Sequence, residues 1–213
     1  SPEYRGHSKK LGKLLSFSRF LYIAMYPEKF KEQLHSELMP PLGSDGKSPL
    51  WEAIGRRFMN MDYAEADQLS RNNKEFILSL YPSDNIYQTL LPIEARNSIG
   101  KVSKETMPVK SMLEKIGFTY AEEVDPFDGG PHYKANTKDV STINSLKAMS
   151  IKVDKSIDLN STRPYLISVK LDEYFFSAVK VDGIITPDSQ HLLIKSELPK
   201  LLSDNQHVNL VEL

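Results

Sequence analysis

Hydrophobic positions along this chain recur with two periods, one helical and one extended. Residues 11–26 form the first helical run, which Pro27 ends. The run "TMPVKSMLEKIGF" (106–118) carries further helix signals, with the cap-type residue Thr106 at its start and Gly117 as its stop. We therefore expect amphipathic helices over 11–26 and 106–118.

The chain between these two helices has shorter signals. Gln33–Met39 indicates a short strand, and Ser48 followed by Pro49 predicts the start of a helix that continues through Phe58. Asp62 with Glu65 resembles a capping box in front of "AEADQLS". The run "KEFILSLY" fits a helix or a buried strand equally well, because its periodicity does not distinguish them. Pro92 opens the run "IEARNSI", and Gly100 is its expected C-terminal stop.

Extended patterns dominate the remaining part of the chain. "FTYAEEV" and "HYKA" predict two strands around the tight turn "DPFDGGP" (Asp125–Pro131). Residues 137–163 are polar and indicate a linker or boundary, and three strand-like runs follow, with a short helix near 196–203. We expect an α+β fold with a main domain over 1–136, a linker over 137–163 and a small β module over 164–213.

Composition excludes several classes of protein. The 213 residues carry 27 Lys and Arg against 28 Asp and Glu, and this balance argues against nonspecific nucleic-acid binding. Cysteine is absent, which removes thiolate nucleophiles and Cys-based zinc sites. Apolar runs are shorter than the roughly 18 residues of a membrane span. We expect a cytoplasmic protein with neither nucleic acid nor membrane as partner, and we predict no metal site.

The first helical run follows a basic, glycine-bearing turn, "RGHSKKLGK" (Arg5–Lys13). Backbone N–H groups at a helix N-terminus attract anions, and glycine allows close approach of the backbone. The alternative is a solvated basic helix start. If the turn holds a phosphate, the candidate residues are Arg5, Gly6, Lys10, Leu11, Gly12 and Lys13.

Four segments in order, "YRGHSKKLGKLLSFSRFLYIA", "SPLWEAIGRRFMNMDYAEADQLS", "YPSDNIYQTLLPIEARNSIGKV" and "LEKIGFTYAEEVDPFDGGP", resemble the arginine N-succinyltransferase family. The resemblance implies a GNAT-like acyltransferase fold and transfer of succinyl from succinyl-CoA to the α-amine of arginine. Succinyl-CoA would be a co-substrate, with no tightly bound cofactor. The basic turn would hold the CoA pyrophosphate, although Lys10 stands where the family pattern expects a glycine.

The catalytic histidine of the family lies in a V-H-x-x-T-x-P segment, and this chain has Ser103 at that position. A serine hydroxyl does not exchange protons near neutral pH as an imidazole does. His132 is the best remaining imidazole for a catalytic acid or base. The alternative is that His132 is an ordinary, partly exposed histidine on a strand. Carboxylates that could bind the guanidinium of an arginine substrate are Glu37, Asp125 and Asp128. The alternative is that these residues have only structural roles in turns and on the surface.

The resemblance also implies a substantial N-terminal portion ahead of the basic turn. Either this chain is part of a longer enzyme, or a separate polypeptide completes the sheet, or a truncated relative has another function. Because an unpaired sheet edge is normally covered, we expect a tightly associated partner chain or an oligomer. Two alternatives to the arginine enzyme stay open. One is a non-catalytic regulatory subunit that binds CoA or an amino acid, and the other is a sister acyltransferase acting on ornithine or another amine.

Overall fold

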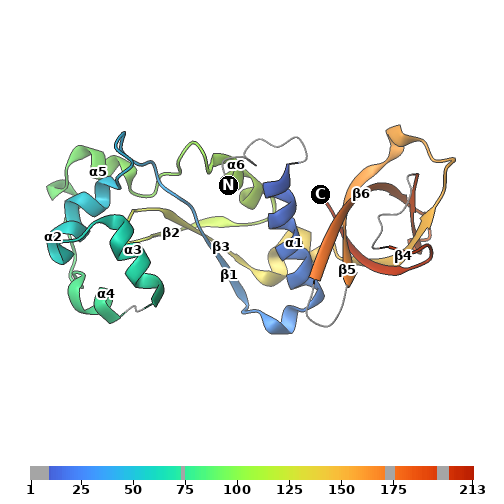
Figure 1. Cartoon of the computed structure of the whole chain (residues 1–213), viewed down its shortest axis with the longest axis horizontal. Coiled ribbons are helices and arrows are strands. Elements are labelled where there is room, and N and C mark those ends of the chain that lie inside the picture. The colour runs from blue at the N-terminus through green and yellow to red at the C-terminus, as the bar shows by residue number, and fades with distance from the viewer. Residues whose placement is uncertain (1–9, 73–74, 171–175, 196–201) are drawn as a thin grey trace. The chain divides into compact units, whose positions relative to one another are not determined.

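A computed structural model describes residues 10–72, 75–170, 176–195 and 202–213 of the chain (Figure 1). The chain divides into two compact units. One contains the residues up to Glu32 together with Asn136–Leu213, and we call it the barrel unit. The other, which we call the sheet unit, contains Gln33–Ala135.

Five strands of the barrel unit close on themselves in the order β4-β7-β6-β5-β8. Their bounds are β4 Lys147–Val153, β5 Arg163–Lys170, β6 Phe176–Ile185, β7 His191–Ile194 and β8 His207–Glu212. Strands β4 and β7 pair in parallel, and the other pairs are antiparallel. Ile151, Ile167 and Leu192 are fully buried inside the barrel. Closure removes the free edges that an open sheet of these strands would expose.

Helix α1 (Leu11–Met25) belongs to the barrel unit, where it contacts β5 and the short helix α7 (Ser141–Asn144). Its apolar face buries Phe17, Phe20 and Leu21. The helix predicted over 11–26 is therefore confirmed. The described part of this unit also contains three short 3-10 turns, at Pro27–Lys29, Thr137–Asp139 and Leu159–Ser161. Among the described residues, no helix combines the length and the apolar character that crossing a membrane requires.

The sheet unit contains three strands in the order β1-β3-β2. Their bounds are β1 Gln33–Glu37, β2 Thr119–Val124 and β3 Pro131–Asn136. Figure 1 shows that helices α2 to α5 gather at one end of these strands. The helical segments are a π-helical turn at Trp51–Gly55, α2 Arg56–Met59, α3 Tyr63–Asn72, α4 Glu75–Leu80, a 3-10 turn at Gln88–Leu90, α5 Ile93–Ser98 and α6 Met107–Lys115.

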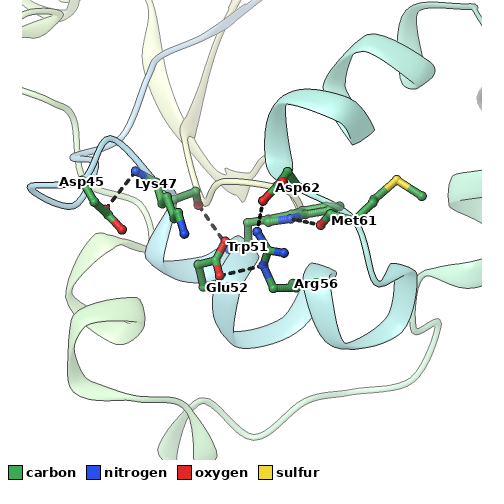
Figure 2. A network of polar contacts seen from close by, with 8 residues as sticks. Asp45, Lys47, Trp51, Glu52, Arg56, Met61 and Asp62 are labelled. Atoms are coloured by element: carbon green, nitrogen blue, oxygen red, sulfur yellow. Dashed lines mark hydrogen bonds and ion pairs between the residues drawn. The ribbon is translucent and has the colours of Figure 1, made fainter.

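Trp51 forms the centre of the helical end of the sheet unit and is fully buried (Figure 2). Its backbone N–H donates to Ser48 Oγ at 3.1 Å, which confirms Ser48 as a helix cap. Its indole Nε1 donates to the Met61 carbonyl oxygen at 3.1 Å, so the buried donor is satisfied. The indole ring packs against Phe127, with 4.9 Å between ring centroids. This contact ties the helices to the turn between β2 and β3.

A polar cluster flanks Trp51 on the outside of the same helical turn (Figure 2). Arg56 Nε donates to Glu52 Oε2 at 2.7 Å, and the other arm of the guanidinium binds the Asp62 carboxylate. These bonds raise the pKa of Arg56 and lower that of Asp62. Asp62, predicted as part of a capping box, therefore holds the connection between α2 and α3 through Arg56.

The structure resolves or corrects several predictions about local elements. Within the ambiguous run "KEFILSLY", Glu75–Leu80 is helical, as α4. Thr106 precedes α6, but its side chain makes no capping bond to the helix and its hydroxyl donates to the Met39 carbonyl oxygen at 3.1 Å instead. Gly100, with φ of 68°, follows α5 as predicted.

The division of the chain differs from the predicted one in two ways. Residues 137–163, predicted as a linker, contain α7 and β4, and β4 is a full member of the barrel. The polar sequence of this segment reflects its exposed face, because Met149 and Ile151 of β4 are buried in the barrel. Helix α1, predicted as part of the main domain, packs in the barrel unit instead. The short helix predicted near 196–203 lies largely outside the described residues.

Candidate functional site

A bulge in β2 sets the positions of the polar side chains on the sheet. Thr119 pairs with Lys134 at the start of β2, whereas Val124 pairs with Pro131 at its end, so the register shifts between them. Glu122 lies in the shifted stretch with a positive φ of 58°, a conformation that non-glycine residues rarely adopt. Continuing the Val124 register back by one residue places Glu123 opposite His132.

The turn after β2 is held by a dense set of backbone hydrogen bonds. Asp125 Oδ1 accepts from the N–H groups of Phe127 at 2.7 Å and Asp128 at 3.2 Å. The Asp125 N–H donates to the Gly130 carbonyl oxygen, and the Gly129 N–H donates to the Asp125 carbonyl oxygen, both at 2.8 Å. Asp125 is therefore fixed in direction at the end of the sheet.

Asp128 lies inside the same turn and is 6% exposed. Its Oδ1 accepts from the Gly130 N–H at 2.8 Å, and its Oδ2 accepts from the Tyr63 hydroxyl at 3.2 Å. Burial raises the pKa of Asp128, although the bond from Gly130 opposes the rise. Because both carboxylate oxygens bind groups of the fold, Asp128 has a structural role here, which is one of the two roles that the sequence left open.

Glu37, Asp125 and His132 converge at this end of the sheet. Each offers one ligand-type atom, and these atoms lie within 4.8 Å of one another. Glu37 ends β1, and the next residue, Leu38, donates its N–H to the Pro131 carbonyl oxygen at 3.1 Å. Burial by the surrounding atoms, followed by the charges of Asp125 and Asp128, raises the pKa of Glu37.

His132 belongs to the outward face of β3, because the alternation of the strand buries Pro131 and Tyr133 on the other face. Its Nδ1 lies 3.7 Å from Glu123 Oε2. Its Nε2 is inaccessible to solvent and has no hydrogen-bond partner among the described residues. The His35 ring packs edge-on against the His132 ring at 4.4 Å between centroids. Desolvation and the neighbouring His132 lower the pKa of His35.

Glu123 is held on its other side by Lys134, whose Nζ lies 2.6 Å from Oε2. This ammonium holds the pKa of Glu123 below its ordinary value. The result is a polar row across two strands, from Lys134 through Glu123 to His132. Glu123 could not be identified from the sequence, because no glycine marks the bulge that places it opposite His132.

Ser103, which the resemblance aligns with the family's catalytic histidine, is buried with 4% exposed. Its hydroxyl lies 2.9 Å from Thr106 Oγ1, and its N–H donates to the Met39 carbonyl oxygen at 2.9 Å. The Ser103 carbonyl oxygen also accepts from the Met107 N–H at 3.0 Å. Ser103 therefore joins the start of α6 to the segment that follows β1.

The basic turn is described from Lys10 onward, and Arg5 and Gly6 lie outside the described residues. Lys10 adopts the left-handed conformation, with φ of 50° and ψ of 49°, immediately before α1. This conformation is the one that glycine adopts most easily. A Cβ on Gly12 would meet no atom within 4 Å. Lys13 lies over the Phe17 ring at 5.1 Å.

The structure thus brings Glu37, Asp125 and His132 together in the sheet unit. It assigns Ser103 and Asp128 to bonds within the fold, and it places Lys10, Leu11, Gly12 and Lys13 in the barrel unit. The sheet unit has its own polar centre, and the start of α1 belongs to a separate unit.

Comparison with known proteins gives a consistent result. The family model for the arginine N-succinyltransferase beta subunit matches residues 1–142. Arginine N-succinyltransferase of Yersinia enterocolitica is 38% identical over 194 residues, which cover 90% of this chain and 55% of that protein. Arginine N-succinyltransferase subunit beta of Pseudomonas aeruginosa is 39% identical over 157 residues, which cover 73% of this chain and 46% of that protein.

A solved structure is also similar, that of arginine/ornithine succinyltransferase subunit AI from Pseudomonas aeruginosa. It aligns with a TM-score of 0.75 and 30% identity, covering 94% of this chain and 57% of that one. The mixed α+β fold with its five-stranded barrel resembles that structure. The chain spans about half the length of the curated relatives it matches. On the match to residues 1–142 and the identity to these relatives, the chain belongs to the arginine N-succinyltransferase family.

Proposed function

We propose that this chain contributes to an enzyme that transfers a succinyl group from succinyl-CoA to the α-amine of arginine. Family membership supports the reaction class, and the convergence of Glu37, Asp125 and His132 is the observation that carries the proposal within this chain. Two carboxylates beside an imidazole match what the acceptor requires, namely partners for a cationic group and a base for an amine.

The carboxylates bind the acceptor in this proposal. Glu37 is exposed enough to reach a ligand, and Asp125 Oδ1 is fixed by two backbone N–H groups. A guanidinium between these side chains replaces the unfavourable proximity of two like charges with charge-assisted hydrogen bonds. The acceptor would thereby be held in place while its amine reacts.

His132 is the proposed proton acceptor. Its Nδ1 lies 3.7 Å from Glu123 Oε2, and its buried Nε2 has no hydrogen-bond partner among the described residues. Nε2 is therefore the nitrogen left to accept a proton once a bound acceptor reaches it. In the reaction the amine nitrogen bonds to the thioester carbonyl carbon, and the C–S bond breaks. The amine gives up one proton, and CoA leaves as a thiolate that takes up a proton.

The start of α1 is the proposed site for the CoA pyrophosphate. The open space around Gly12 leaves the first turn of the helix accessible to a ligand, and Lys10 and Lys13 supply positive charge beside it. Because GNAT-like architecture is part of this proposal, the remaining part of the fold would come from a further segment or a partner chain. The relatives described as a beta subunit and as subunit AI support a partner of this kind.

Two other functions have specific support. Ser103, whose hydroxyl is engaged with Thr106, favours a non-catalytic subunit that binds CoA or an amino acid. The similar structure of an arginine/ornithine succinyltransferase subunit favours ornithine as an alternative acceptor.

Release of free CoA tests these functions directly, since the chain has no cysteine and adds no thiol of its own to the assay. The assembled protein is mixed with succinyl-CoA and either arginine or ornithine. We expect thiol release that requires an acceptor, and a His132→Gln variant that is slower by about 10²- to 10⁴-fold. Glu37→Gln should raise KM for the acceptor, and Glu94→Gln on α5 is the matched carboxylate control. Thiol release equal to the background with both amines would exclude the catalytic function, and succinyl-CoA binding without turnover would establish the non-catalytic one.

A further inference from the structure

Glu37, Asp125 and His132 have the composition of a metal-binding group as well as that of a substrate site. Their ligand-type atoms all lie within 4.8 Å of one another. Atoms bound at about 2.1 Å to a shared tetrahedral cation lie about 3.4 Å apart, so a small contraction brings them into a coordination sphere. Glu37 is an exposed residue at the end of β1, and its flexible side chain can supply that movement.

The surroundings of His132 provide an independent observation. Histidines that bind metals usually present their second ring nitrogen to a carboxylate, which fixes the ring and increases its basicity. Glu123 occupies that position, 3.7 Å from Nδ1, and Lys134 anchors Glu123 in turn. The opposite nitrogen, Nε2, is inaccessible to solvent and lacks a hydrogen-bond partner among the described residues. A buried polar atom of this kind requires an explanation, and an ion is one of the few available.

Asp125 is also held in position by the fold. Two backbone N–H groups bind its Oδ1 and fix the direction of the carboxylate, which lies against the Glu37 carboxyl group. Glu37 and Asp125 meet closely enough to repel each other when both are ionised, and a cation between them removes that repulsion. The two carboxylates and one imidazole leave a fourth position open, as in zinc sites that also bind a small molecule.

We propose that Glu37, Asp125 and His132 form a binding site for a divalent transition-metal cation, with Zn²⁺ as the best match to one imidazole and two carboxylates. Glu123 is a positioning residue for His132. A consequence rests on the proposed function: the same atoms would bind the acceptor's cationic group, so the metal competes with the acceptor. The metal therefore inhibits the transfer reaction in this proposal.

Cobalt provides a direct test that does not require activity. The assembled protein, treated with a chelator and dialysed, is titrated with Co²⁺ while the visible absorption of the bound ion is followed, and Zn²⁺ is then added to displace it. We expect one saturable Co²⁺ site per chain, with affinity reduced at least 10-fold in Glu37→Gln and in His132→Gln. Glu123→Gln should weaken binding by about 10-fold through the loss of ring positioning.

Two variants serve as matched controls. His207→Gln removes an exposed histidine of β8, and Glu94→Gln removes an exposed carboxylate of α5. Both should bind Co²⁺ as the unchanged protein does, and circular dichroism verifies that all variants are folded. Absence of a saturable Co²⁺ spectrum, or equal affinity in His132→Gln and His207→Gln, overturns the metal site.

The competition is measured separately, so that the two proposals fail in different ways. With thiol release as the assay, Zn²⁺ should raise the apparent KM for the acceptor at constant kcat. A saturable Co²⁺ site in a protein without turnover supports the metal site and contradicts the proposed reaction. If the protein binds Co²⁺ through His132 but Zn²⁺ does not change its turnover, the metal and the acceptor do not share a site.

Discussion

Substituting Gly130 with alanine tests whether close packing at the end of the sheet positions the site. A Cβ at Gly130 would lie 2.4 Å from the Leu38 carbonyl oxygen and 2.9 Å from Asp128 Oδ1. A carbon and an oxygen in ordinary contact are separated by about 3.4 Å, so the backbone of Leu38 has to move by about 1 Å. Because Leu38 follows Glu37 directly, this movement displaces Glu37 from Asp125 and His132.

The free-energy cost follows from the same geometry. Overpacking of a close contact costs about 1–3 kcal/mol, and this one involves backbone atoms that side-chain rotation does not relieve, so about 2–3 kcal/mol is expected. For a unit of this size, that destabilisation lowers the melting temperature by at least about 8 °C. The fluorescence of Trp51, the single tryptophan of the chain, reports the sheet unit alone. Below the transition, Co²⁺ affinity should fall by about 10-fold.

Gly12→Ala is the matched control, because the same methyl group enters open space there. In the first turn of α1 it should stabilise the barrel unit by about 0.5–1 kcal/mol and leave the Trp51 transition unchanged. A Trp51 transition in Gly130→Ala within about 2 °C of that of the unchanged protein would refute the close-packing argument. A lower melting temperature with unchanged Co²⁺ affinity would show that the packing at Gly130 stabilises the sheet unit without positioning the site.

Three further substitutions probe individual contacts. Tyr63→Phe removes the hydroxyl that donates to Asp128 Oδ2 and should reduce the free energy of unfolding by about 1 kcal/mol in urea titrations, whereas no change would mean that this bond is not maintained in solution. Burial raises the pKa of Tyr81 to about 12. The unfolded chain therefore loses the Tyr81 proton near pH 10 while the folded chain retains it, so stability falls as pH rises from 10 towards 12. A difference of about two pKa units corresponds to about 3 kcal/mol, which solvent near the partly exposed side chain reduces to about 1–2 kcal/mol. The fall should be smaller by this amount in Tyr81→Phe than in the unchanged protein, and parallel pH curves would contradict this assignment. Lys10→Gly relieves a left-handed conformation and should raise the thermal stability of the barrel unit by about 1 kcal/mol, measured by circular dichroism, and an unchanged or lower melting temperature would show that the conformation is not strained.

Elements with local signals could be predicted from the sequence. The apolar repeat of α1, the Ser48 cap and the stop at Gly100 each depend on a few neighbouring residues, and the structure confirms them. The strands on either side of the turn at 125–131 were predictable for the same reason, since the turn itself requires Asp and Gly.

Features that depend on distant pairing could not be predicted in this way. Strand β4 lies in a polar segment, and its parallel partner β7 is only four residues long, so neither has a strong pattern of its own. The bulge in β2 places Glu122 at a positive φ that its residue type does not announce. The separation of α1 from the sheet unit likewise follows from packing against β5, which lies far along the chain.

The candidate site depends both on local sequence signals and on the pairing of distant strands. Glu37, Asp125 and His132 were identifiable one at a time, as chemically capable residues near predicted strand ends. Their spacing in the sequence gives no sign of a shared centre, because the order β1-β3-β2 and the β2 bulge bring them together. The metal site proposed for these residues could not be predicted for the same reason, since ligand spacing identifies a site only when the ligands are close in sequence.

Lys10 offers a way to separate conformation from chemistry at the start of α1. The left-handed backbone conformation at Lys10 favours glycine, and the Lys10 side chain makes no capping hydrogen bond to the helix. Replacement of Lys10 with glycine should therefore increase the stability of the barrel unit. If the lysine ammonium also binds the CoA pyrophosphate, the same replacement should weaken succinyl-CoA binding. Stability and affinity would then change in opposite directions, as expected when a strained residue is retained for binding. Stability and affinity that both increase would instead indicate that glycine's backbone contacts suffice for the phosphate, and that Lys10 impairs the turn.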